Sequence, residues 1–162
     1  MLSRRHDPGA PRPRNPVPVA PRHGRRCAPR SSALDADHSL HARATKWFAA
    51  HARGGWASCP ITQNGCLRIM SHPSYPNALP VSAVMDRLAD ASASAVHEFW
   101  ADDLSLLDAN ISIPIRIHGP RQITDLYLLA LAVRHRGQFV TFDASVDMDA
   151  IKGAEAKHLL SL

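Results

Sequence analysis

The sequence lacks several features that would assign a function at once. It has no run of about 18 apolar residues, so it predicts no membrane-spanning helix. No apolar segment follows the first arginines, as it would in a secretory leader. It also has no phosphate-binding glycine loop and no GxSxG nucleophile motif. The three cysteines, Cys27, Cys59 and Cys66, form no CxxC pair, which predicts reduced thiols in a cytoplasmic protein.

The first 30 residues have one acid and few large apolar side chains. They carry eight arginines and seven of the 13 prolines, whereas 11 Lys or Arg face 13 Asp or Glu from residue 31 onward. The basic charge therefore belongs to this tail. Such a stretch cannot bury enough surface to offset its ordering entropy, so we expect it to be disordered. Pro16 and Pro18 remove ladder donors, so we expect no strand from Val17 to Ala20.

Helical and strand patterns alternate along the remainder of the chain. We expect helices over 37–53, 63–70, from Pro80 onward, 125–135 and 147–151, and strands over 56–59, 98–100, 139–142 and 158–162. Residues 111–117 alternate like a strand, but Pro114 predicts a loop or an edge there. The alternation predicts one α/β domain with a parallel sheet.

Single residues predict some of the boundaries. Thr62 and Thr124 are candidate helix N-caps, and Gly137 is placed to end the helix over 125–135. Gly65 would let a neighbouring backbone approach closely. The apolar run 126–133 covers most of a helix circumference, so we expect that helix to be largely buried.

Two aspartates stand at junctions of these elements. Asp125 opens the apolar helix, and Asp143 follows the strand over 139–142. Ligands in open parallel sheets bind at the carboxyl ends of the strands. Carboxylates gathered there, without His or Cys beside them, suit Mg²⁺. The alternative is structural, because Asp125 interacts well with a helix dipole and aspartate is common in turns.

Four stretches of residues 34–162 resemble the PIN-domain family, specifically the VapC-type toxin ribonucleases of bacterial toxin–antitoxin pairs. The combination TD–LLALA–TFD is the most specific part of the resemblance. The matching stretches are HARATKWFAAHARGGWASCPITQNGCLRIMSHP (41–73), HEFWADDLSLLDA (97–109), HGPRQITDLYLLALAVRHRGQFVTFD (118–143) and AIKGAEAKHLLSL (150–162).

The resemblance implies a PIN-like three-layer α/β/α fold with a central parallel sheet. It also implies a Mg²⁺-dependent endoribonuclease, with Mn²⁺ as an alternative cation, that acts on RNA and is held by a cognate antitoxin. Members of the family are commonly homodimers. Asp125 and Asp143 fall at positions of two metal-binding catalytic acids.

The sequence departs from the family pattern at two places. Gln63 stands in ITQNG where many members have a glutamate, so it supplies a carbonyl oxygen but no charge. The family's first strand, of the type LLDxNxLIAL with the first metal-binding aspartate, is absent from the sequence. Both departures predict an impaired enzyme.

The tail offers an explanation for the second departure. A GC-rich gene read in the wrong frame yields Arg, Pro, Ala, Gly and His, so we expect residues 1–33 to be a frameshifted or wrongly assigned start, and residues 34–162 to be a PIN-like domain that is incomplete at its N-terminus. Two other functions stay open. The chain could be an inactive PIN remnant that only binds an antitoxin, or it could bind nucleic acid nonspecifically through the basic tail.

Overall fold

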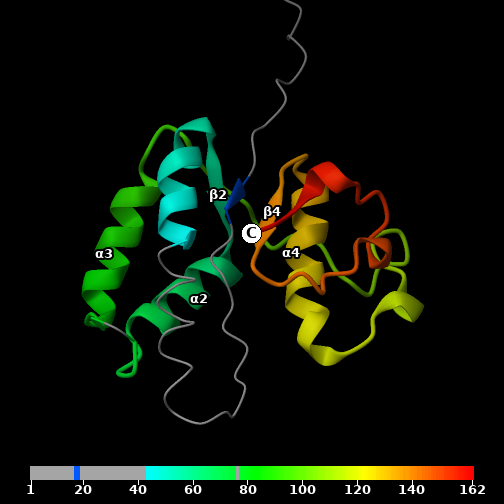
Figure 1. The fold of residues 1–162 in the computed structure, drawn as a ribbon, viewed down its shortest axis with the longest axis horizontal. Helices are drawn as coiled ribbons and strands as arrows, with labels where there is room; N and C mark the ends of the chain where they lie inside the picture. The colour runs from blue at the N-terminus through cyan, green and yellow to red at the C-terminus, as the bar shows by residue number, and fades with distance from the viewer. Residues whose placement is uncertain (1–16, 19–42, 76) are drawn as a thin grey trace, which may run out of the picture.

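The computed structural model describes residues 17–18, 43–75 and 77–162 (Figure 1). Its strands are short, and α4 is its most buried helix. In chain order the elements are β1 (Val17–Pro18), a helix over 43–51, η1 (Ala52–Gly54), β2 (Trp56–Ser58), α2 (Pro60–Met70), α3 (Val81–Ser92), β3 (His97–Phe99), η2 (Pro114–Arg116), η3 (Pro120–Gln122), α4 (Ile123–Arg134), β4 (Phe139–Thr141), η4 (Met148–Ala150), η5 (Ala156–His158) and β5 (Leu159–Ser161).

All of the paired strands run parallel. β2 pairs with β3, and β4 pairs with both β1 and β5. The hydrogen-bonded strands form two sheets, β1-β4-β5 and β2-β3, and β1 contacts β2, so the strands lie in the order β3, β2, β1, β4, β5. Figure 1 shows α2 and α3 on one side of the labelled strands β2 and β4, and α4 on the other. The predicted α/β domain with a parallel central sheet is confirmed.

β1 contradicts the prediction that no strand forms between Val17 and Ala20. Val17 lies opposite Phe139 and Pro18 lies opposite Val140 in a parallel pairing. Proline lacks a donor but keeps its carbonyl, and its fixed φ is compatible with extended backbone, so a two-residue strand tolerates it. Val17–Pro18 therefore lies at the edge of the three-stranded sheet, next to β2 of the other sheet. The rest of the predicted tail, residues 1–33, lies outside the described residues.

α4 supplies much of the core, as the apolar run predicted. Leu126 and Leu129 are fully buried, and they pack in one cluster with Phe139 of β4. All three residues of β4 are buried, so both faces of this strand are covered, as is usual in a parallel sheet. Burial of one such leucine contributes about 1.5–3 kcal/mol.

The ends of α4 differ from the prediction. A 3-10 turn, η3, leads directly into the helix, which begins at Ile123, so Thr124 is inside it and not its cap. At the other end Arg136, with φ of 53°, takes the left-handed conformation. Gly137 follows and donates its N–H to the carbonyl of Ala132 at 2.8 Å. The helix therefore stops where predicted, but through Arg136 and not through Gly137.

α2 begins three residues earlier than predicted. Pro60 occupies its first turn, where a missing N–H costs nothing, and Cys59 is the N-cap. Thr62 reaches back to Cys59, accepting its N–H at 2.9 Å and donating to its carbonyl at 3.0 Å. A Cβ placed on Gly65 would meet none of the described residues within 4 Å, so the predicted close backbone approach does not come from them.

The remaining predictions concern the helix over 43–51 and the C-terminal third. That helix ends through η1 at Gly55, whose φ is 107°, and its predicted start at Asp37 lies outside the described residues. Residues 111–117 form loop and 3-10 turn, with one antiparallel bridge from Ser112 to Ile151. The predicted short helix near 147–151 is η4, and the final strand is β5.

Candidate functional site

Asp125 lies in the first turn of α4, where its carboxylate faces the positive end of the helix dipole. Its side chain is 8% exposed, and it is held by at least one further interaction within the chain. A charged group is seldom buried so far without a partner or a ligand. Asp125 is therefore a fixed acid, as a metal ligand or a structural anchor would be.

Asp143 is the second residue after β4 and is exposed. Its Oδ1 accepts hydrogen bonds from the backbone N–H of Ser145 at 2.8 Å and from the Ser145 hydroxyl at 2.6 Å. The hydroxyl bond first, and then the backbone bond, lower the pKa of the Asp143 carboxyl below its usual value. Its own N–H donates to Thr141 Oγ1 at 3.0 Å. The loop after β4 thus presents a charged carboxylate in a fixed orientation.

The connectivity predicts that the two aspartates lie at the same edge of the sheet. A short connection turns α4 back into β4, and the two elements pack together. From Asp125 to Arg134 α4 rises about 14 Å, and β4 rises about 10 Å before the two-residue step to Asp143, so we expect the two aspartates at a similar height. The fold is thus consistent with the prediction that the start of α4 lies near the end of β4.

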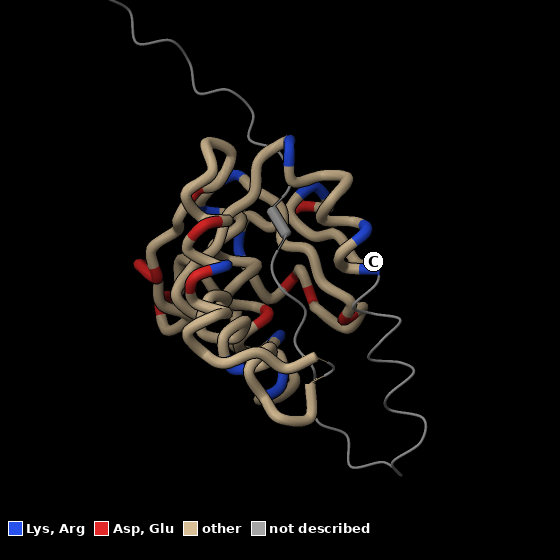
Figure 2. The backbone as a smooth tube through the Cα atoms, turned by 90° about the vertical axis from the view of Figure 1, so that its left-hand side faces the viewer, with Lys and Arg blue, Asp and Glu red and all other residues tan. Residues whose placement is uncertain are grey.

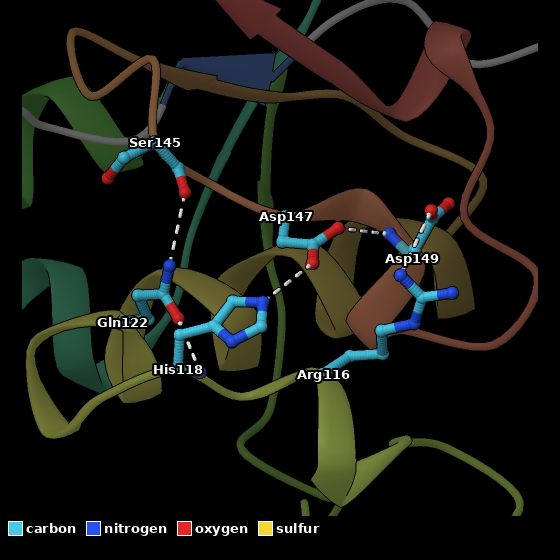
Figure 3. A network of polar contacts seen from close by, with 6 residues as sticks. All are labelled: Arg116, His118, Gln122, Ser145, Asp147 and Asp149. Atoms are coloured by element: carbon cyan, nitrogen blue, oxygen red, sulfur yellow. Dashed lines mark hydrogen bonds and ion pairs between the residues drawn. The ribbon is translucent and has the colours of Figure 1, made fainter.

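A polar network joins the segment before α4 to the loop that carries Asp143 (Figure 3). Gln122 Nε2 donates to the carbonyl of Ser145 at 3.2 Å, and Gln122 Oε1 accepts the N–H of His118 at 3.1 Å. His118 Nε2 lies 3.6 Å from Asp147 Oδ2. Through Ser145, the network fixes the Asp143 turn to the start of α4.

The same network continues to the 3-10 turn η4. Asp147 Oδ1 accepts the N–H of Asp149 at 2.9 Å, and Asp149 Oδ2 lies 4.0 Å from Arg116 Nη1 (Figure 3). Sequence reasoning missed Gln122, His118 and Ser145, although HGPRQ and FDAS adjoin the predicted acids. An aspartate followed two residues later by serine is a common turn pattern, and that signal could have identified Ser145.

Gln63 lies in the first turns of α2, which starts at the carboxyl end of β2. Its Nε2 donates to Ser58 Oγ at 3.0 Å, and Ser58 Oγ lies 2.9 Å from His97 Nε2. Ser58 is 7% exposed, and Gln63 is half-buried. Sequence reasoning missed Ser58 and His97, because they come together only through the parallel pairing of β2 with β3.

β1 lies between the strand that leads to Gln63 and the strand that leads to Asp143. In the sequence, Val19 and Ala20 follow β1, and neither carries a carboxylate. The sequence therefore has no acidic residue at the two positions directly after β1.

The donor set suits a hard cation in kind but not in number. Asp125, Asp143 and Gln63 offer oxygen atoms, which Mg²⁺ and Mn²⁺ prefer. Among the described residues, no group of three or more His, Cys, Asp or Glu is arranged to hold a metal ion. Two carboxylates and one amide would carry less charge than the site implied by the family pattern.

The charges of the described domain are balanced. Residues 43–162 contain eleven Lys or Arg and eleven Asp or Glu. Positions of both signs are spread over the tube in Figure 2. Attraction of a polyanion to this part of the chain would thus depend on local groups and not on net charge. In the described residues, no helix is long and apolar enough to cross a membrane.

Comparison with known proteins gives several related ribonucleases of Mycobacterium tuberculosis, among them the following three. Ribonuclease VapC44 is 48% identical over 129 residues, which is 80% of this chain and 91% of the relative. Ribonuclease VapC38 is 42% identical over 110 residues, 67% of this chain and 76% of the relative. Ribonuclease VapC39 is 36% identical over 118 residues, 72% of this chain and 85% of the relative.

No family model matches the chain, and no solved structure matches it significantly. The identity and coverage of the VapC relatives confirm the resemblance seen in TD–LLALA–TFD. The parallel α/β architecture agrees with the PIN-like fold which that resemblance implied. The chain belongs to the VapC ribonuclease family.

Proposed function

We propose that the chain is a Mg²⁺-dependent endoribonuclease toxin with reduced activity, in which Asp125 and Asp143 hold the cation and Gln63 adds a weak ligand. The observation that carries this proposal is the position of the two aspartates. One starts α4 and the other follows β4, and Gln122 and Ser145 join the two segments. In a family of ribonucleases, fixed acids at a strand end are suited to phosphodiester hydrolysis.

The roles of the two acids differ. Asp125 is buried and fixed, so it would set the position of the cation. Asp143 is held through Oδ1, and within the described part of the chain its Oδ2 has no hydrogen-bond partner, which leaves that oxygen available. Bound Mg²⁺ would supply charge stabilisation and an activated water. The low pKa of Asp143 keeps its carboxylate charged at neutral pH.

The partners and location follow from the same proposal. We expect an RNA substrate, a cognate antitoxin, a homodimer and a cytoplasmic location, with Mn²⁺ able to replace Mg²⁺. Names of the VapC type indicate the ribonuclease activity of the relatives. The antitoxin and the dimer are expectations drawn from the family.

A second candidate function is antitoxin binding by an inactive chain. It is favoured by Gln63, which replaces a charged ligand with an amide, and by the absence of an acid at Val19 and Ala20. Metal affinity depends on the charge of the ligands, so such a site could fail to hold Mg²⁺. Cleavage of RNA separates the two candidates.

The test is cleavage of a mixed RNA substrate by the full chain, with Mg²⁺ and with EDTA. We expect slow cleavage that EDTA abolishes. Asp125→Asn should lower it on the order of 100-fold, the effect of removing one charge-stabilising group. Asp86→Asn is the matched control, because Asp86 is an exposed acid on α3.

Three results would contradict the proposal. Cleavage that persists in EDTA would exclude the metal, and cleavage that persists in both Asp125→Asn and Asp143→Asn would exclude the site. No cleavage by the wild type at any Mg²⁺ or Mn²⁺ concentration, together with antitoxin binding, would establish the second candidate.

A further inference from the structure

The side chains of Gln63, Ser58 and His97 form a short hydrogen-bonded chain behind the candidate site. Gln63 comes from α2, Ser58 ends β2 and His97 begins β3. The two distances that link them are 3.0 Å and 2.9 Å. Trp56 packs against the imidazole, with 4.3 Å between ring centroids, and this fixes the ring that Ser58 contacts.

Ser58 Oγ has one proton to donate. When Gln63 Nε2 donates to Ser58 Oγ, the serine hydroxyl is free to donate to His97 Nε2. Ser58 is buried and has no other side-chain partner in the described residues, so its hydroxyl proton is paired only when His97 Nε2 accepts it, and a neutral His97 then carries its own proton on Nδ1. The direction of the Gln63–Ser58 bond thus favours one tautomer of His97, the one that leaves no buried hydroxyl proton unpaired.

The direction also determines which end of the Gln63 amide is available. With Nε2 bound to Ser58, Oε1 has no hydrogen-bond partner in the described part of the chain, so the amide offers an acceptor. The flipped amide would turn Oε1 to Ser58 and leave the NH₂ group available instead. An NH₂ group carries positive partial charge and would repel a cation.

We propose that Ser58 and His97 are positioning residues that hold the Gln63 amide with its carbonyl oxygen available as a cation ligand. This inference rests on the proposed function, because it requires a cation beside Gln63. The contact between Ser58 and His97 makes the hydroxyl an acceptor toward Gln63. Without that contact the hydroxyl could donate to Oε1 or accept from Nε2, and neither amide orientation would be favoured by Ser58.

Replacing Gln63 by glutamate should reverse the donor and acceptor roles in both hydrogen bonds of Ser58. A carboxylate only accepts, so the Ser58 hydroxyl would donate to it, and His97 would have to donate from Nε2 to Ser58 Oγ. The predicted change is a shift of the His97 proton from Nδ1 to Nε2 in Gln63→Glu. A role for Ser58 in packing alone would not produce this change.

The experiment is long-range ¹H–¹⁵N NMR of the ¹⁵N-labelled full chain at pH 8, where an ordinary imidazole is neutral. We expect His97 to be protonated on Nδ1 in the wild type, to move to Nε2 in Gln63→Glu, and to lose its tautomer preference in Ser58→Ala. Ser58→Thr keeps a hydroxyl and should restore the wild-type signals. Ser161→Ala removes an exposed hydroxyl at the end of β5 and should change nothing at His97.

Addition of Mg²⁺ alone then tests the ligand role. The side-chain amide signal of Gln63 should shift on titration in the wild type and in Ser58→Thr, and this shift should be lost in Ser58→Ala. If Ser58→Ala does not fold, the comparison of wild type, Ser58→Thr and Gln63→Glu still decides the direction of the two hydrogen bonds.

The proposal is overturned if wild-type His97 is protonated on Nε2, or if its tautomer is the same in Gln63→Glu. It is also overturned if the side-chain amide signal of Gln63 in the wild type does not shift on addition of Mg²⁺. None of these measurements uses RNA. A chain that passes them without cleaving RNA would contradict the ribonuclease function and not the positioning role.

Discussion

Ser145 binds one oxygen of Asp143 twice, through its hydroxyl at 2.6 Å and through its backbone N–H at 2.8 Å. This double contact keeps Asp143 charged and orients its other oxygen. Ser145→Ala removes the shorter bond, so we expect slower RNA cleavage with little loss of stability. Solvent screens an exposed carboxylate, so the free energy of unfolding should fall by less than about 1 kcal/mol. Cleavage assays and urea unfolding measure the two effects, and unchanged cleavage would exclude this role.

Gln122 and Gln138 form a matched pair for testing the network before α4. Gln122 donates to the carbonyl of Ser145 at 3.2 Å, and Gln138 donates to the carbonyl of Lys157 at 3.1 Å. Gln138→Ala should cost about 0.5–1.5 kcal/mol of stability, and Gln122→Ala up to about twice that, because it also loses the bond from the His118 N–H. Only Gln122→Ala should slow cleavage, by about 10-fold, because only that bond reaches the Asp143 loop. Equal activity in the two variants would show that the network is structural.

His158 predicts a pH dependence of folding. It is buried, and its Nδ1 accepts the N–H of Glu155 at 3.0 Å. Burial lowers the pKa of His158 from its ordinary 6.5, with a smaller effect from Lys157 in the same direction. Between the ordinary and the lowered value the unfolded chain binds more protons, so the free energy of unfolding falls as the pH drops below about 6.5.

His158→Asn tests this dependence, because an amide oxygen can accept the same N–H. We expect a smaller loss of stability between pH 7 and pH 5 than in the wild type. His72→Asn is the control, since His72 Nδ1 accepts the N–H of Ser74 at an exposed site. Urea unfolding at each pH gives the slope, and a wild-type slope in His158→Asn would contradict the assignment.

β1 can be tested with two truncations. A chain that starts at residue 16 keeps Val17–Pro18, whereas a chain that starts at residue 19 loses it. If β1 pairs with β4, the free energy of unfolding of the second chain should be lower because it lacks a few backbone hydrogen bonds, each of which contributes about 0.5–1.5 kcal/mol. Equal urea midpoints would show that the pairing of β1 with β4 adds nothing to the stability of the domain.

The strongest sequence signals predicted the elements that form the core and carry the two acids. The apolar run of α4 and the β-branched and aromatic residues of β4 determine both elements almost by themselves. Asp125 and Asp143 stand at the ends of these elements, so a correct prediction of α4 and β4 placed the acids as well. Their assignment as metal ligands stays a prediction.

Weaker signals failed where one residue has two uses. Pro60 can end a strand or begin a helix, and the sequence alone favoured the first. Pro18 argued against a strand that the sheet nevertheless accommodates. Contacts such as Ser58 with His97 join positions 39 residues apart, and they depend on strand register, which no local pattern contains.

The central claim is that Asp125, Asp143 and Gln63 form a cation site with too little charge. Calorimetric titration of Mg²⁺ into the wild type, Gln63→Glu and the double variant Gln63→Glu/Asp125→Asn tests it most directly. One added carboxylate should tighten binding at least about tenfold, which is about 1.4 kcal/mol. Removal of Asp125 should abolish the gain. We predict weak binding by the wild type and tighter binding by Gln63→Glu. Equal Mg²⁺ affinity in all three chains would contradict the account.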